Sequence, residues 1–212
     1  PRRYGEAFVV NMDHVLTLIR TGAEKNDPRQ GDVVDVSVRG WFTWSEKQKW
    51  LHKLFHVPVQ FSVASTVLPL DPYFMGILLG DGQMQQRVGV TTMAPEVAAM
   101  VYAEAERYGL KVRVDNNGSR ASTYVLSQGN IGHAKKHLVM EMLRTLGLWG
   151  CDADTKFIPS QFKTASEQDR LSLFAGLMDS DGHLSGNCYD FISKSKTLAD
   201  DATEAQKTST PC

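Results

Sequence analysis

Two segments of the chain carry almost the same pattern of apolar and small residues, one over residues 74–82 and one over residues 174–182. Each is a largely apolar run with small residues at its third and seventh positions, and each ends in Asp-Gly. A repeated segment usually implies a repeated structural unit. The pattern therefore predicts two helices of similar construction, each of which delivers one carboxylate at its end.

The first of these helices has clear boundary residues. Asp71 is a good N-cap, Pro72 suits the first helical turn, and Gly82 suits the exit. Alternating apolar and polar residues then predict short strands in two stretches. Apolar residues that recur at helical spacing predict two more helices. We expect the order helix, strands, helix, strands, helix, with strands over 83–92 and over 111–126 (broken by a turn at 115–118) and helices over 95–108 and 131–148.

The pattern restarts after residue 165. Ser166 can cap a helix that runs into Asp181-Gly182. Residues 183–185 and 189–192 look like the two arms of a hairpin around Gly186-Asn187. Residues 197–207 are expected to be helical, so only about half of a second repeat precedes the end of the sequence.

Residues 1–67 have a different, β-rich pattern. Apolar residues 7–10 and 15–19 flank a polar turn at 11–14 and predict a hairpin, and residues 33–38 predict another strand. Ser45 can cap a helix over 46–55, and three tryptophans are expected in the core: Trp41, Trp44 and Trp50. The whole pattern predicts an α+β fold with divisions at 1–67, 68–165 and 166–212.

Composition narrows the class of protein further. The chain has 212 residues and a net charge of −1, and no apolar stretch approaches the roughly 20 residues of a membrane-spanning helix. We see no secretory signal, and the three cysteines show no metal-ligand spacing. A reducing intracellular setting fits best, without indicating a compartment. The start at Pro1 and the abrupt end lead us to expect a fragment or a processed piece.

The small residues of the two repeated segments indicate how the predicted helices meet. Gly76 and Gly80 are four apart, as are Gly176 and Ser180, so each pair shares one helix face. Packing these faces together would place the carboxylates of Asp81 and Asp181 near one another, which is electrostatically costly. A divalent cation removes that cost. Mg²⁺ is commonly held by one or two carboxylates plus substrate phosphate, so phosphodiester hydrolysis is the expected chemistry.

With these residues in place, the two segments resemble the paired motifs of the LAGLIDADG homing endonucleases. Residues 174–182 match the helix consensus at six of nine positions: Ala175, Gly176, Leu177, Asp179, Asp181 and Gly182. Residues 74–82 resemble the Leu-Gly-Asp-Gly form found in intein-borne members, and Lys156-Phe157-Ile158-Pro159 resembles a Lys-x-Ile-Pro element. The resemblance implies αββαββα repeats, Mg²⁺ held by Asp81 and Asp181, and Lys156 as a basic active-site residue.

Residues 5–16 resemble a splicing element of inteins. His14 matches the histidine that assists the N-terminal acyl shift, and Asn11 stands where Thr is usual. The resemblance implies that residues 1–67 are part of a Hint-type splicing domain. No nucleophile opens the sequence and no His-Asn pair closes it, and the second endonuclease repeat lacks its later strands and final helix. We therefore expect a family architecture that is incomplete at both ends.

Contacts with DNA must come from local basic patches, because the net charge is near zero. Four basic residues lie in or beside the predicted strands: Arg87, Lys111, Arg113 and Arg120. Lys111 and Arg113 share one strand face, and a two-stranded ribbon can enter the major groove. Phosphate contact is the expected role of these residues, with base recognition open for some and a simple solvated strand face as the alternative.

The leading hypothesis is an intein-encoded endonuclease that binds a long duplex site and cuts both strands. Its expected partners are double-stranded DNA and the host protein's exteins, with a complementing fragment or a second chain possible and no membrane. Three alternatives stay open: a degenerate remnant that binds DNA without cutting or splicing, a splicing-only intein fragment, and an RNA-splicing maturase that uses the same helix motif.

Overall fold

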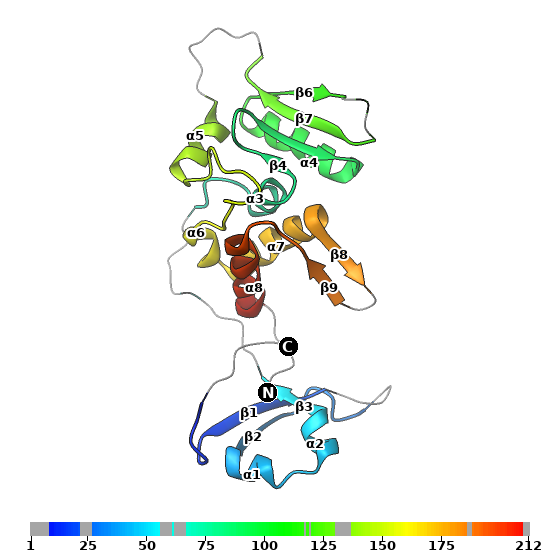
Figure 1. Ribbon diagram of the computed structural model, residues 1–212, viewed down its shortest axis with the longest axis vertical. Helices are drawn as coiled ribbons and strands as arrows, with labels where there is room; N and C mark the ends of the chain where they lie inside the picture. The colour runs from blue at the N-terminus through cyan, green and yellow to red at the C-terminus, as the bar shows by residue number, and fades with distance from the viewer. Residues whose placement is uncertain are drawn as a thin grey trace. The chain divides into compact units, whose positions relative to one another are not determined.

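The computed structural model describes residues 9–21, 27–55, 61, 67–116, 118, 120–129, 137–185 and 188–209. The chain divides into two compact units, residues 1–57 with 210–212 and residues 58–209. Helices and strands are mixed throughout the described ranges, which confirms the α+β class (Figure 1). Across these described ranges, every helix is too short or too polar to traverse a lipid bilayer.

The smaller unit is built on a three-stranded antiparallel sheet. Strand β1 (Val15–Arg20) lies in the centre, between β2 (Val33–Ser37) and β3 (His52–Leu54). The predicted hairpin between residues 7–10 and 15–19 is wrong where it can be judged, since residues 9 and 10 are not in a strand. Both edges of β1 already pair with β2 and β3, and residues 7–8 lie outside the described ranges.

Two short helices follow β2 in this unit. Helix α1 (Val38–Phe42) was not predicted, and α2 (Glu46–Leu51) starts at Ser45 with a complete capping box. The prediction that α2 continues to residue 55 is wrong, because the chain enters β3 at His52 and pairs with β1. Trp50 is 64% exposed, so its predicted place in the core is wrong too. Of the described apolar side chains in this unit, only Leu18 and Leu51 are buried.

The first half of the larger unit follows the predicted order of elements. Helix α3 (Pro72–Leu79) is followed by β4 (Gly82–Gln83), β5 (Val88–Thr92), α4 (Pro95–Arg107), β6 (Lys111–Asp115), β7 (Ser122–Ser127) and α5 (Leu138–Thr145). The strands form one antiparallel sheet in the order β4-β5-β7-β6. Helix α5 is shorter than the predicted 131–148, because His137 caps its start; residues 131–136 lie outside the described ranges.

The second half repeats the pattern on a smaller scale. Its elements are α6 (Ser160–Lys163), α7 (Glu167–Asp181), β8 (Gly182–Ser185), β9 (Cys188–Phe191) and α8 (Lys196–Ser209). The hydroxyl of Ser166 accepts a hydrogen bond from the Asp169 amide at 3.1 Å, as an N-cap should. The predicted cap, hairpin and final helix are thus confirmed, whereas α6 was not predicted.

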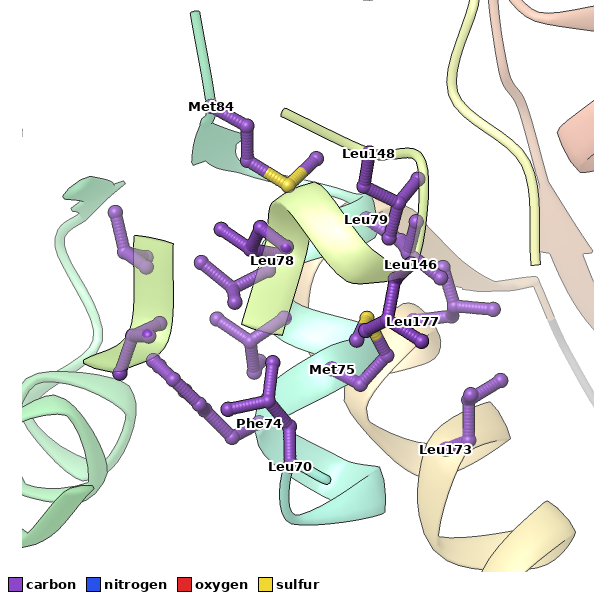
Figure 2. Close-up of a cluster of buried hydrophobic side chains, with 14 of the residues drawn as sticks. Leu70, Phe74, Met75, Leu78, Leu79, Met84, Leu146, Leu148, Leu173 and Leu177 are labelled. Atoms are coloured by element: carbon purple, nitrogen blue, oxygen red, sulfur yellow. The ribbon is translucent and has the colours of Figure 1, made fainter. Parts of the chain in front are cut away.

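The core of the larger unit surrounds α3. Every residue from Phe74 to Leu79 is buried, which explains why this helix is apolar on all sides. Side chains from α4, α5, the sheet and α7 join it in one cluster (Figure 2). Figure 1 shows α3 and α7 side by side, with the four-stranded sheet next to α3 and the β8-β9 ribbon next to α7.

Candidate active site at the ends of helices α3 and α7

The backbones of α3 and α7 touch along the stripe of small residues. A Cβ atom added at Gly76 would lie 2.2 Å from the Leu173 carbonyl oxygen, and one added at Gly176 would lie 2.2 Å from the Tyr73 carbonyl oxygen. Both distances are far below van der Waals contact, so only glycine fits at either position. The predicted packing of the two repeated helices is confirmed.

The stripe continues to the end of each helix. A Cβ atom at Gly80 would lie 2.0 Å from Ser180 Oγ and 3.4 Å from a carboxylate oxygen of Asp181. The Ser180 hydroxyl donates to the Gly176 carbonyl at 2.9 Å, which turns it along its own helix. The carboxylate of Asp181 therefore lies against the last turn of the other helix.

The two helices end in slightly different ways. Helix α7 includes Asp181, as predicted, but α3 ends at Leu79 with Gly80 as its C-cap, so the predicted exit at Gly82 is wrong by two residues. The turn after each helix is nevertheless the same. A Cβ atom at Gly82 would lie 2.2 Å from the Leu78 carbonyl oxygen, and one at Gly182 would lie 2.4 Å from the Met178 carbonyl oxygen. Glycine in both Asp-Gly pairs lets the chain fold back over the helix it has just left.

The two carboxylates occupy an unfavourable environment for negative charge. Burial raises the pKa of Asp81 to about 6, with a further increase from the negative charge of Asp181, against the opposing effect of Lys156. Burial also raises the pKa of Asp181, and Lys156 again opposes the shift. The neutral forms are therefore favoured beyond their usual pH range, unless a cation is supplied.

Lys156 completes this group of charges. Its side chain is only 5% exposed, and its ammonium group donates to the Gly80 carbonyl oxygen at 2.7 Å. Burial lowers the pKa of Lys156, and the two carboxylates partly offset that effect. Asp81, Asp181 and Lys156 are thus brought together at one end of the helix pair, from three separate parts of the chain.

These groups are compatible with a hard divalent cation. Across the described residues, no group of three or more His, Cys, Asp or Glu side chains has the arrangement of a metal site. Two carboxylates are nevertheless what Mg²⁺ commonly takes from a protein, because it keeps several waters and binds substrate phosphate as well. The partly buried carboxylate of Asp81, with the negative charge of Asp181 near it, forms an environment that a bound cation would stabilise.

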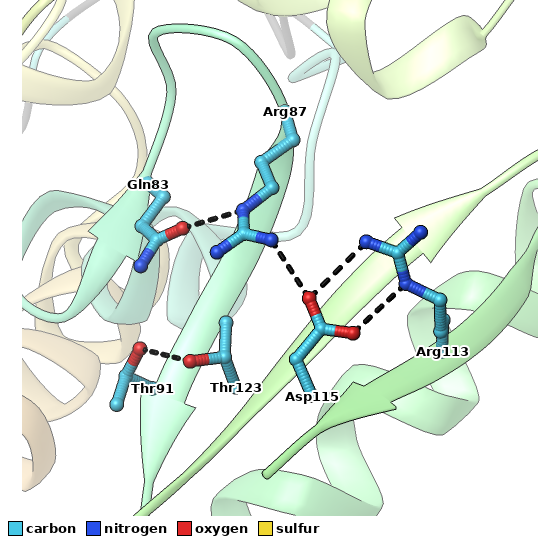
Figure 3. Close-up of polar contacts among 6 residues, drawn as sticks. All are labelled: Gln83, Arg87, Thr91, Arg113, Asp115 and Thr123. Atoms are coloured by element: carbon cyan, nitrogen blue, oxygen red, sulfur yellow. Dashed lines mark hydrogen bonds and ion pairs between the residues drawn. The ribbon is translucent and has the colours of Figure 1, made fainter. Parts of the chain in front are cut away.

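A second group of charges lies on the outer face of the four-stranded sheet (Figure 3). The Arg87 guanidinium donates to Gln83 at 2.8 Å and to Asp115 at 2.7 Å. Arg113 donates to both carboxylate oxygens of Asp115, at 2.9 and 3.1 Å. The two arginines lower the pKa of Asp115, with the hydrogen bond from Arg113 the largest cause. One carboxylate thus fixes two arginines that the sequence pattern had placed only in or beside the predicted strands.

The other predicted DNA-binding residues flank this pair of arginines. Lys111 is exposed two residues before Arg113 on β6, and it pairs across the ladder with Ser127. Arg120 is exposed and lies between β6 and β7, outside both strands. The sequence analysis missed Asp115 and Gln83. Asp115 carried a signal, since it follows Arg113 at the spacing that puts both on one strand face.

The splicing-associated residues lie in the smaller unit. Asn11 and His14 are exposed in the turn before β1, where the His14 amide donates to the Asn11 carbonyl at 3.3 Å. The predicted turn at this position is therefore present. Within the described residues, neither side chain makes a contact that would reveal a chemical role.

No protein-family model matches the chain, and no curated sequence matches it. Any proposal about function must therefore be argued from the candidate site.

Proposed function

We propose that this protein is a site-specific double-strand DNA endonuclease of the LAGLIDADG type, which hydrolyses phosphodiester bonds with Mg²⁺ and is carried in an intein. One observation carries the proposal. Two helices of repeated sequence meet through their backbones, and their ends bring Asp81, Asp181 and buried Lys156 together. A purely structural helix pair does not need two mutually repelling carboxylates at its end.

The arrangement of elements supports the same proposal. The run α3-β4-β5-α4-β6-β7-α5 follows the αββαββα order that the resemblance implies, and α7-β8-β9-α8 follows its first half. The two repeated helices lie at the centre of the unit, with a sheet on each side (Figure 1). In this proposal the two sheets flank the site where the DNA is cut.

In the proposed site, Asp81 and Asp181 would hold Mg²⁺ through their carboxylates. The bound cation would stabilise negative charge on the scissile phosphate. Asp81 and Asp181 would also orient the water molecules retained by the cation, since both accept hydrogen bonds when ionised. Their raised pKa values make metal binding pH-dependent, because a protonated carboxyl is a poor ligand.

Lys156 has a separate task in this proposal. Its ammonium group is buried and already bonded to the Gly80 carbonyl oxygen, so it is fixed before DNA binds. A fixed donor at a charged phosphate costs no reorganisation at the moment of reaction. Lys156 would therefore donate to a phosphate oxygen or to the attacking water.

The outer face of the four-stranded sheet is the proposed DNA-contacting surface. Arg87 and Arg113 are pre-oriented by Asp115, and Lys111 adds a charge at the same face. Basic side chains on a ribbon of this kind can contact phosphates or enter the major groove. Arg120, beside the strands, would add a phosphate contact.

The smaller unit is proposed to derive from a Hint-type splicing domain, with the exteins of a host protein as partners. It forms a compact unit of its own, and the predicted turn holds Asn11 and His14. A complementing fragment or a second chain is a further proposed partner.

The decisive experiment is a cleavage assay on a plasmid library with a randomised insert, run with and without Mg²⁺. Asp81→Asn and Asp181→Asn should each lower the cleavage rate by about 100-fold or more. Each substitution removes one of the two negatively charged carboxylates that are proposed to hold Mg²⁺ at the scissile phosphate. Asp179→Asn is the matched control, since it removes from the same helix a carboxylate that accepts from the Tyr73 hydroxyl and does not belong to the proposed site.

Each outcome has a clear meaning. Cleavage that disappears in both site variants and survives in the control would support the endonuclease. A wild-type chain that shifts DNA on a gel and never cuts it would instead favour the remnant that binds without cleaving. A chain that neither binds nor cuts DNA would contradict the proposal.

A further inference from the structure

The segment that carries Lys156 has no regular secondary structure, yet it is buried. Residues 156–159 lie between α5 and α6, outside any helix or strand, and both Lys156 and Ile158 are at most 5% exposed. A lysine side chain has several rotatable bonds, so its ammonium group stays in one place only if its backbone does. The contacts that hold this backbone therefore decide where the ammonium group lies.

Ser195 holds the first residue of the segment. Its hydroxyl donates to the Lys156 carbonyl oxygen at 2.6 Å and accepts from the Leu198 amide at 3.1 Å. Ser195 is 1% exposed. A single buried hydroxyl thus joins the start of α8 to the backbone of Lys156.

Asp201, one and a half turns further along α8, holds the segment two residues later. One carboxylate oxygen accepts from the Ile158 amide at 2.9 Å, and the other accepts from the Lys163 ammonium at 2.9 Å. Asp201 is buried as well, so these bonds are shielded from water. Ser195 and Asp201 thus bind the backbone groups of Lys156 and Ile158, the residues on either side of Phe157.

We propose that Ser195 and Asp201 are positioning residues that fix the Lys156 ammonium at the Gly80 carbonyl, and thereby set the geometry of the DNA-cleaving site. The inference rests on the proposed function for its consequence in catalysis, although the positioning itself is independent of it. Helix α8 belongs to the active site in this view, despite contributing no group that touches the substrate.

Asp200 on α8 and Lys163 on α6 provide control substitutions that leave the bonds to the Lys156 segment intact. Asp200 is exposed and pairs with Lys196 within the same helix. Asp200→Ala thus removes a carboxylate from α8 without touching the Lys156 segment. Lys163→Gln removes the ion pair of Asp201 and leaves its bond to the Ile158 amide available.

The test uses nuclear magnetic resonance of the lysine ammonium groups in the whole chain. A buried ammonium that donates to a carbonyl exchanges its protons slowly enough to give a signal, and Lys156→Arg assigns that signal. We expect the Lys156 signal to shift or vanish in Ser195→Ala and in Asp201→Ala. It should stay in place in Asp200→Ala and Lys163→Gln. Retained near-ultraviolet circular dichroism identifies the variants that still fold.

Cleavage of DNA provides the second measurement. The single-turnover rate should fall by about 10- to 100-fold in Ser195→Ala and Asp201→Ala, as expected for a displaced catalytic group, with DNA affinity unchanged. If Asp201→Ala does not fold, Ser195→Ala alone decides. A Lys156 signal unchanged in folded Ser195→Ala overturns the positioning role. A displaced signal in a protein whose wild type never cuts DNA supports positioning and contradicts the endonuclease instead.

Discussion

The two halves of the larger unit are alike where their helices meet and differ in the sheets that follow. Helices α3 and α7 carry small residues at the same positions and touch at equivalent glycines, Gly76 and Gly176. The first half then builds a four-stranded sheet, whereas the described second half has the two-stranded ribbon β8-β9. The comparison shows that the helix interface constrains the sequence of both halves, while the sheets are free to differ.

The carboxylates of the proposed site are matched between the two halves, whereas the arginines of the proposed DNA-contacting surface are not. Asp81 and Asp181 occupy matching places at the ends of matching helices, so the chemistry of the site is nearly symmetric. The arginine pair fixed by Asp115 belongs to the first half, and the described part of the second half has no matching trio. Contacts with a bound duplex would therefore be uneven along its length.

The largest expected effect comes from breaking the symmetric interface. Gly76→Ala and Gly176→Ala should each destabilise the unit by about 3 kcal/mol, because each new Cβ overlaps a backbone oxygen that cannot move aside. The gain in helix propensity, about 1 kcal/mol, is too small to compensate. Urea denaturation followed by circular dichroism measures both values.

Gly89→Ala provides the control for these substitutions. The nearest atom to its new Cβ is a carbonyl oxygen at 3.3 Å, and the next is a side-chain methyl at 3.5 Å. We expect a change of less than about 1 kcal/mol there. Nearly equal losses for Gly76→Ala and Gly176→Ala would support the symmetry of the interface, and a mild effect at either position would refute it.

A smaller effect is expected from removing the charge of Asp81, which is disfavoured first by burial and then by the negative charge of Asp181. The pKa of Asp81 is raised from 3.8 to about 6, so the folded state binds this proton more tightly than the unfolded state, and stability is lost as the pH rises from about 4 to 6. Asp81→Asn should therefore stabilise the fold at pH 7 by about 1–2 kcal/mol, after allowance for solvent screening of a half-buried group. At pH 3.5 the variant and the wild type should be nearly equal.

Thermal unfolding at a series of pH values measures this difference. Asp200→Asn is the control, since its carboxylate is exposed and paired with Lys196 at the surface. If Asp81→Asn destabilised the fold equally at pH 3.5 and pH 7, the cost of a buried negative charge beside Asp181 would not be the cause.

The asymmetric sheet should give a still smaller and purely functional effect. Arg113→Gln removes a charge from the outer face, so the slope of log K against log salt concentration should fall by about 1, with an affinity loss of about 1 kcal/mol. Fluorescence anisotropy with a labelled duplex at several salt concentrations measures both quantities. His183→Gln on exposed β8 should leave the slope unchanged, and an equal effect there would mean that the two halves contact DNA alike.

The smallest effect concerns one polar contact across the helix pair. The Tyr73 hydroxyl donates to Asp179 at 2.7 Å, and burial together with this carboxylate raises the pKa of Tyr73 to about 12. Tyr73→Phe should cost about 0.5–1 kcal/mol, since the pair is partly exposed. Ultraviolet titration of Asp179→Ala should show a Tyr73 pKa below about 12 but still above the ordinary value of 10, because burial remains when the carboxylate is removed; an unchanged value of about 12 would mean that burial alone sets it.

The sequence predicted the parts of the fold that depend on local patterns. The Asp71 cap, the strands over 83–92 and 111–126, and the Ser166 cap all follow from residue type and spacing. The stripe of small residues also predicted the helix contact, because the repeat supplied both partners. These signals are strong because each is complete within a few residues.

The remaining features depend on residues far apart in the chain. The pairing of β1 on both edges, and with it the end of α2 at Leu51, was set by tertiary contacts that no local pattern reveals. Trp50 failed as a core residue for the same reason. The sequence patterns assigned no role to Ser195 or Asp201, and only the fold shows their hydrogen bonds to the Lys156 carbonyl and the Ile158 amide.

The wide sequence separation of the contacting groups has a consequence for biosynthesis. Lys156 meets Gly80 across 76 positions, and Tyr73 meets Asp179 across 106. Loops of this length close slowly compared with local turns, and during translation they cannot close until the second partner has left the ribosome. The four-stranded sheet can fold earlier from neighbouring residues. A nascent chain would therefore acquire the proposed DNA-contacting surface before the carboxylate pair, so the order of synthesis would delay the proposed cutting activity until the helix pair has assembled.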